Sequence, residues 1–220
     1  MPALNARWIR LPLAWIHGEG LTEFRAGQHL GSSMAALKVL VAILFRAENK
    51  TPQEATVTQG SASLSYDDLM VMTGLSRSMV RKGTLRLCDA GLVNVTHEGK
   101  GRKNRYFVVD YSATPWGKLP YRQIAGPGTS QELKLLNELS CKSVVDLNAL
   151  KLFLLLSAHR DKVSQYAMIG YTKIEEATGI WRDNIRRAIS ILIEHGLVRV
   201  EQEKTPGEYN TPNRYRILGL

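Results

Sequence analysis

One stretch of sequence occurs twice in this chain, and the repetition limits the possible folds more than any other feature. Residues 65–95 align with residues 170–200 without a gap. Shorter matching segments surround them in the same order. Trp-Ile-Arg-Leu-Pro (8–12) matches Trp-Gly-Lys-Leu-Pro (116–120), and two further segments occur in both repeats: Ala-Leu-Lys (36–38 and 149–151) and Asn-Arg-Tyr (104–106 and 213–215). This internal duplication predicts two domains of similar structure, residues 1–111 and 112–220.

The repeated stretch has the pattern of two helices joined by a tight turn. Gly74 can supply the positive φ at which one helix stops, and Ser76 can cap the next helix by accepting a bond from an unpaired backbone N–H. The residues at helical spacing that we expect to face the core are Val80, Gly83, Thr84 and Leu87. The remaining positions predict a basic outer face: Arg77, Ser78, Arg81, Lys82 and Arg86.

A two-stranded hairpin is expected after each pair of helices. In the first repeat, strands at 92–96 and 106–111 flank a basic tip that contains two glycines, as a hairpin loop requires. The second repeat has a longer and more acidic counterpart at 201–218. Before each helix pair an apolar segment predicts a buried core helix, at 33–46 and 146–159.

The sequence also predicts a loop, an additional helix and the placement of two tryptophans. Residues 47–63 are polar and predict a loop. A capping box at Thr129 and Glu132 predicts an additional helix with no clear equivalent in the first repeat. We expect Trp8 and Trp116 to anchor their segments in the core; the alternative is that one of these segments pairs with another protomer.

Charge and cysteine content narrow the class of protein. The net charge of +9 and the pI near 9.7 suggest a polyanionic partner, and both repeats share the basic excess. The longest apolar runs are too short to span a bilayer, and no lipidation motif or export signal is present, so nucleic acid is favoured over a membrane. Cys88 and Cys141, the two cysteines, stand at non-equivalent positions, which excludes a disulfide framework and favours a reducing cytoplasm.

No pattern in the chain predicts an enzyme. The motifs of a phosphate-binding loop, a zinc-protease helix and a serine nucleophile elbow do not occur. The five histidines lie far apart and lack the spacing of a metal site. We therefore expect no catalytic residue, no metal ligand and no cofactor.

With these features the chain resembles the winged helix-turn-helix superfamily, twice over and across nearly its whole length. The residues that carry the resemblance are Thr-Gly-Leu-Ser-Arg-Ser (73–78), Ala-Gly-Leu-Val (90–93) and Asn-Arg-Tyr on the hairpin, which look like those of many bacterial, phage and plasmid DNA-binding domains. The resemblance implies an α+β, mainly helical fold of two tandem winged helix-turn-helix domains. The two-domain layout is also similar to that of plasmid Rep-type replication initiators, a likeness of architecture without a motif peculiar to them.

The resemblance implies that the second helix of each pair enters the major groove, where Arg can bond to guanine and Asn to adenine. The expected contacts in the first repeat are Ser76, Arg77, Ser78, Arg81 and Lys82. Those in the second repeat are Arg182, Asn184, Arg186 and Arg187, although Trp181 and Asp183 make that helix less basic. The alternative is an ordinary solvated face in each repeat.

The hairpins, or wings, are expected to contact phosphate or the minor groove through long cations. The candidates on the first wing are Lys100, Arg102, Lys103 and Arg105. On the second wing the candidate is Arg214, beside several acidic residues, and a wing that does not touch DNA is an equal alternative. Asn104, Tyr106 and their counterparts in the second repeat are expected to have structural roles. For the matched Arg105 and Arg214, a structural role is an open alternative to DNA contact.

These observations favour sequence-specific binding of double-stranded DNA in the cytoplasm, in association with the nucleoid. Our main hypothesis is a transcriptional regulator of a bacterium or a mobile genetic element. One alternative is an initiator of plasmid or phage replication that binds origin repeats. Another is a winged-helix protein-interaction module in a nucleoprotein complex, with a homodimer or a protein partner.

Overall fold

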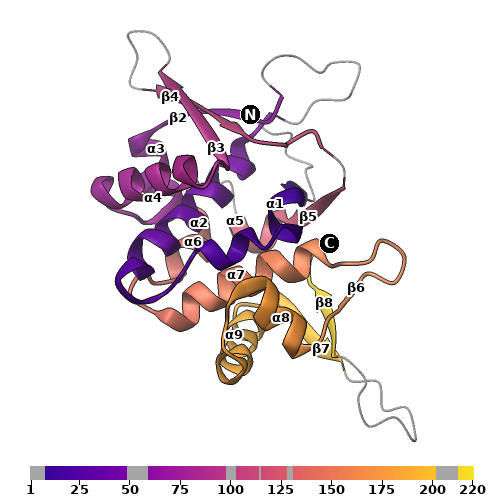
Figure 1. Cartoon of the computed structure of the whole chain (residues 1–220). Helices are drawn as coiled ribbons and strands as arrows, with labels where there is room; N and C mark the ends of the chain where they lie inside the picture. The colour runs from indigo at the N-terminus through magenta and orange to yellow at the C-terminus, as the bar shows by residue number, and fades with distance from the viewer. Residues whose placement is uncertain (1–7, 49–58, 98–102, 114, 128–130, 202–212) are drawn as a thin grey trace, which may run out of the picture.

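The computed structural model describes residues 8–48, 59–97, 103–113, 115–127, 131–201 and 213–220 (Figure 1). Its fold is α+β and mainly helical, as predicted. Matching elements follow one another in the first half (residues 1–111) and in the second half (residues 112–220). Figure 1 shows the first half above the second, with the longest helix of each half between them.

The first half begins with strand β1 (Trp8–Pro12), helix α1 (Ala14–His17) and the 3-10 turns η1 (Gly20–Glu23) and η2 (Gly27–His29). The long helix α2 (Leu30–Arg46) follows. The remaining elements are strand β2 (Ser61–Ser65), helices α3 (Tyr66–Thr73) and α4 (Arg77–Asp89), and strands β3 (Val93–His97) and β4 (Lys103–Val108).

The second half opens with strand β5 (Trp116–Pro120), helix α5 (Tyr121–Ala125) and helix α6 (Lys134–Glu138). Its long helix is α7 (Val144–Ala158). The remaining elements are strand β6 (Tyr166–Met168), helices α8 (Tyr171–Thr178) and α9 (Arg182–Glu194), and strands β7 (Val198–Glu201) and β8 (Arg214–Ile217).

Most of the predicted elements are confirmed, with boundaries shifted by a few residues. The four residues expected to face the core from α4 are its buried residues. The prediction of a loop through residue 63 is wrong in its last part, because β2 lies there; β6 was missed as well. Ser61–Ser65 offers only two apolar side chains, so pairing with β4 rather than strand propensity holds it. The additional helix α6 begins at Lys134, and Thr129 of the expected capping box lies outside the described residues.

Each half contains an antiparallel three-stranded sheet with its last strand in the middle. The orders are β2-β4-β3 and β6-β8-β7. Tyr106 of β4 pairs with Ala62 and Val95 on its two sides, and Tyr215 of β8 pairs with Ala167 and Val200. Both tyrosines are fully buried. The two sheets therefore place the same residue types at the same positions.

The segments that begin the two halves pair with each other as β1 and β5. Their antiparallel register is symmetric about Arg10 and Lys118, with Trp8 opposite Pro120 and Pro12 opposite Trp116. The two Trp rings stack with their centroids 5.0 Å apart, and both are only half-buried. The prediction that the two Trp side chains face the core is wrong, because Ile9, Leu11 and Leu119 of these strands face it instead. The alternative was pairing with another protomer, but β1 pairs with β5 of the same chain.

The halves share one continuous hydrophobic core, in which α2 and α7 are buried along most of their length. The packing also crosses between halves, because η1 contacts α8 and α6 contacts α3. In length and composition the helical stretch Gly27–Arg46 could cross a membrane, but 72% of its apolar window is buried inside the protein. A core helix of a soluble protein passes the same test, so the stretch is weak evidence for a membrane span.

Candidate nucleic-acid interface

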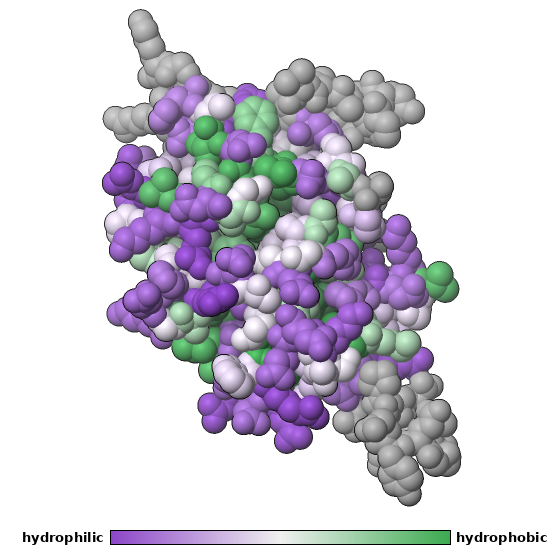
Figure 2. Space-filling model, viewed as in Figure 1, coloured by the Kyte–Doolittle hydropathy of each residue, from purple (hydrophilic) through white to green (hydrophobic). Residues whose placement is uncertain are grey.

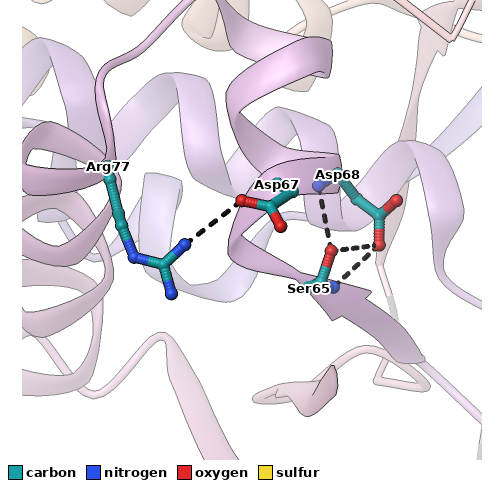
Figure 3. A network of polar contacts seen from close by, with 4 residues as sticks. All are labelled: Ser65, Asp67, Asp68 and Arg77. Carbon is teal, nitrogen blue, oxygen red and sulfur yellow. Dashed lines mark hydrogen bonds and ion pairs between the residues drawn. The ribbon is translucent and has the colours of Figure 1, made fainter. Parts of the chain in front are cut away.

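Helix α3 begins at a capping box that fixes its direction. Ser65 Oγ accepts a hydrogen bond from the Asp68 backbone N–H (3.0 Å), and Asp68 Oδ2 accepts bonds from the Ser65 backbone N–H and hydroxyl (2.8 Å each; Figure 3). Burial alone would raise the pKa of Asp68, but these bonds and the nearby Lys103 and Arg46 lower it below its usual value. The charged carboxylate therefore stabilises the start of the helix.

The turns that connect the helix pairs are built alike in the two halves. Thr73 and Thr178 are fully buried, and each hydroxyl donates to the carbonyl four residues earlier (2.5 Å in both). Each also accepts a bond from the backbone N–H two residues later, at 3.4 and 3.1 Å. Gly74 and Gly179 have φ of 67° and 65°, the left-handed conformation that ends a helix at low cost only for glycine.

Helix α4 carries the first predicted recognition surface. Ser76 caps it by accepting a bond from the Met79 backbone N–H (3.4 Å). The predicted DNA-contacting residues on this helix are all exposed: Arg77, Ser78, Arg81 and Lys82. Arg86 differs from the expectation, because its guanidinium donates to the Glu23 carbonyl and lies over the Phe24 ring. It holds η1 against α4 instead of facing solvent.

Arg77 has a counter-ion within its own helix pair. Its guanidinium forms a 3.1 Å ion pair with Asp67 of α3 (Figure 3). The same group lies 5.4 Å from the centre of the Tyr66 ring. The Arg77 and Asp67 side chains are 67% and 63% exposed, so solvent screens their attraction and the pair contributes little stability. Asp67 therefore orients Arg77 without removing it from the surface.

Helix α9 carries the second predicted recognition surface. Arg182, Arg186 and Arg187 are exposed, and Arg182 lies over Tyr171 (5.9 Å) as Arg77 lies over Tyr66. The predicted residue Asn184 is half-buried and lines a cleft at the α8–α9 turn, so it does not share this exposed face. In place of a capping serine stands Trp181, 76% exposed and without a capping bond.

The predicted wing residues fall into different environments. Lys103 is exposed at the start of β4, whereas Arg105 is half-buried within that strand and donates to Ser61 Oγ (3.4 Å). Arg214 begins β8 and lies over the Tyr166 ring (5.7 Å). These two arginines therefore pack against the first strand of each sheet. Lys100 and Arg102 lie outside the described residues.

The matching Asn and Tyr residues of the hairpins form one contact twice. Asn104 Nδ2 donates to the Tyr106 hydroxyl (3.4 Å), and Asn213 Nδ2 donates to the Tyr215 hydroxyl (3.3 Å). Burial raises the pKa of each tyrosine to about 12. Both tyrosines are neutral core residues, which agrees with the structural role expected for them.

The surface view agrees with the exposed charged residues described on α4 and α9. Figure 2 shows hydrophilic residues along the left flank and over the lower end of the molecule, where Figure 1 places α4, α8 and α9. Among the described residues, no three His, Cys, Asp or Glu side chains are grouped so that they could hold a metal ion. Exposed arginine or lysine side chains lie on both α4 and α9.

Comparisons with models of protein families, with curated proteins and with solved structures gave no match to this chain. Its function is therefore inferred from the residues themselves. Two features of the helix pairs escaped the sequence analysis: the Asp67 counter-ion of Arg77, and the cleft beside Asn184. The acidic pair Asp67 and Asp68, which has Thr172 and Lys173 as its counterpart, was a signal for the first.

Proposed function

We propose that this chain binds double-stranded DNA sequence-specifically through two tandem winged helix-turn-helix domains, residues 1–111 and 112–220, that arose by internal duplication. The observation that carries the proposal is the matching position of α4 and α9. Each is the second helix of a pair, buries one face, and leaves arginine or lysine side chains exposed along its N-terminal half. The N-terminal residues of such a helix are the ones that contact base edges in the major groove.

The arrangement around these helices supports the proposal. A hairpin follows each of them, and Lys103 is exposed at the base of the first hairpin, where a cation can contact phosphate. The symmetric β1–β5 pairing is what an approximate two-fold relation between the halves would produce. Dimeric DNA-binding proteins use such a relation to present two helices to successive major grooves. A chain with two unequal halves can read an asymmetric site.

The biological role that we propose is transcriptional regulation in a bacterium or on a mobile genetic element. The test is selection of bound sequences from a random duplex library by the full chain, repeated at two salt concentrations. An enriched motif with two half-sites is expected, and a search of the host genome with it would separate promoters from replication origins. The absence of enrichment, with affinity that collapses as salt rises, would contradict sequence reading and leave binding to phosphates alone.

A further inference from the structure

A cleft of about 460 Å³ lies at the turn between α8 and α9. It forms where the η1–η2 segment of the first half meets the helix pair of the second half, and it is lined by residues from both. The polar and aromatic residues of its lining include Arg25, Asn148, Lys151, Glu175, Trp181 and Asn184. Its volume lies within the range of pockets that hold small ligands.

Two polar residues of α7 line the cleft and are almost completely buried. Asn148 is 7% exposed and Lys151, one helical turn further on, is 3% exposed. Lys151 Nζ donates to the Phe24 carbonyl (3.1 Å), which leaves two of its three donors without a partner among the described residues. The Asn148 side-chain amide forms no hydrogen bond with any residue of the described part of the chain. Neither residue has a solvent-excluded polar atom without a partner, so the Asn148 amide meets solvent in the cleft. Donors that bond only to water there are available to a ligand that displaces the water.

The charges around the cleft favour an anion. Burial and the neighbouring Arg25 lower the pKa of Lys151 to about 8, so the amine lies near a second cation. Within the described ranges no carboxylate forms an ion pair with Lys151, although Glu175 lines the same cleft. The N-terminus of α9 also borders the cleft at Trp181, where the helix dipole adds partial positive charge.

The equivalent place in the first half is closed. Asn137 of α6 lies over the α3–α4 turn, where its side-chain amide donates to the Met72 carbonyl (3.1 Å) and its Oδ1 would be 2.5 Å from a Cβ at Gly74. Lys38, the counterpart of Lys151, bonds to the Thr73 carbonyl and has Asp146 nearby. The open cleft is therefore particular to the second half.

We propose that this cleft binds a small molecule bearing a carboxylate or phosphate group, which accepts hydrogen bonds from Lys151 and Asn148 and is paired with Arg25. The binding itself does not depend on the proposed function. Its consequence does rest on that function: a ligand against Trp181 and Asn184 would fix the start of α9 and so change how the second half binds DNA. Ligand binding and DNA binding can thus be tested separately.

The first experiment uses the full chain without DNA. Inorganic phosphate and, separately, acetate are titrated by calorimetry at ionic strength held constant with sodium chloride, and saturable binding of at least one is expected. Asn148→Leu and Lys151→Met should weaken binding at least about tenfold, since each removes a hydrogen-bond donor to a charged group. Arg25→Gln, an exposed substitution that leaves the core untouched, should weaken it several-fold. Lys173→Gln, exposed on α8 outside the cleft, is the matched control and should bind as the parent does.

Two results would overturn the proposal. One is the absence of saturable binding of either anion by the parent chain. The other is binding that stays unchanged in both Arg25→Gln and whichever core variant keeps its native circular dichroism spectrum. A last arm repeats the phosphate titration with the selected DNA duplex bound: retained phosphate binding supports a small-molecule site, whereas competitive displacement would assign the cleft to a DNA phosphate and overturn it.

Discussion

The helix pairs α3–α4 and α8–α9 have the same arrangement of helices and turn. They differ in how tightly neighbouring residues fill the space around that turn. In the first half α4 lies so close to α2 that a Cβ at Gly83 would come within 2.7 Å of the Ala35 backbone. The corresponding residues of the second half are Ala188 and Asn148, which are larger. Together with Asn137 over the first turn, this difference gives the first half a closed helix pair and the second half an open one. The same backbone arrangement can thus keep its surface helix in place while the space beneath that helix changes.

The two pairs also differ in charge where they are otherwise alike. The first pair has Asp67 against Arg77, whereas the second has Thr172 at the corresponding position near Arg182. Beneath the turns the difference has the same direction, because Lys38 has Asp146 as a neighbour and Lys151 has Arg25. Arg77 and Lys38 of the first half therefore each have a carboxylate nearby, from Asp67 of the same half and Asp146 of the second, whereas Lys151 has a second cation beside it.

The largest expected effect compares the two predicted recognition helices. We expect Arg81→Ala with Lys82→Ala, and separately Arg186→Ala with Arg187→Ala, to weaken binding of the selected duplex about 100-fold or more, since each lost contact costs roughly 1–3 kcal/mol. Fluorescence anisotropy at one fixed salt concentration measures the change.

A control for lost charge is Arg122→Ala with Lys134→Ala, a pair of exposed residues on α5 and α6. It should weaken binding much less than either helix variant. If only the Arg81→Ala and Lys82→Ala variant of α4 lost affinity, the second half would not contact DNA through α9. The first half would then be the DNA-binding domain and the second half a regulatory one.

The second effect concerns the two buried lysines. Lys151 has a folded pKa of about 8 against an ordinary value of 10.5, so the unfolded chain binds more protons between these values and stability rises with pH across that window. The shift corresponds to roughly 3 kcal/mol at pH 7, which Lys151→Met should recover in part by removing the buried charge beside Arg25 and Glu175. Urea unfolding at pH 7 and at pH 9.5 should show the advantage shrinking as pH rises.

Lys38→Met is the matched variant in the first half. Burial also lowers the pKa of Lys38, but the Cys141 and Asp146 side chains counteract the shift. We therefore expect a smaller gain, or a loss, from Lys38→Met at pH 7. Equal gains from both substitutions would contradict the difference in charge balance between the halves.

The third effect tests the closeness of α4 and α2. Gly83→Ala improves intrinsic helix propensity by about 1 kcal/mol, but its new Cβ would meet the Ala35 backbone, so we expect a net destabilisation of about 2 kcal/mol. The reciprocal change Ala188→Gly should cost about 2 kcal/mol, because it loses about 1 kcal/mol of helix propensity together with the burial of a methyl group. Urea midpoints of both variants measure the free energies, and a stabilising Gly83→Ala would show that the first half can open as the second does.

Local signals made the helix pairs and the hairpins predictable from the sequence. Glycine at 74 and 179, the Ser76 cap and the helical spacing of Val80 and Leu87 act within a few residues, where sequence patterns are reliable. The strand β2 was missed because its polar sequence becomes a strand only through pairing with β4. Whether Ser61–Ser65 forms a strand therefore depends on residues about 40 positions later in the sequence.

The contacts between the halves could not be predicted for the same reason. The repeated Trp-x-x-Leu-Pro segments were visible, but not that they pair with each other and stack their Trp rings on the outer side. The cleft depends on how η1 and the residues just after it pack against α8 and α7, a contact between the halves without a local signal. Of the candidate site, the exposed arginine and lysine positions on α4 and α9 were foreseen, while the half-buried position of Asn184 was not.

The smallest expected effect concerns the Asp67–Arg77 ion pair. Asp67→Asn should raise affinity for the selected duplex about two- to five-fold, because an exposed pair contributes at most about 1 kcal/mol and Arg77 would no longer have to give it up. Thr172→Asp introduces a carboxylate at the corresponding position of the second half and should lower affinity by a similar factor. Both effects should shrink as salt is raised, since the charges are exposed. Asp89→Asn, at the far end of α4, measures the general effect of losing one negative charge; weaker binding by Asp67→Asn would instead mean that Asp67 holds Arg77 in its DNA-contacting position.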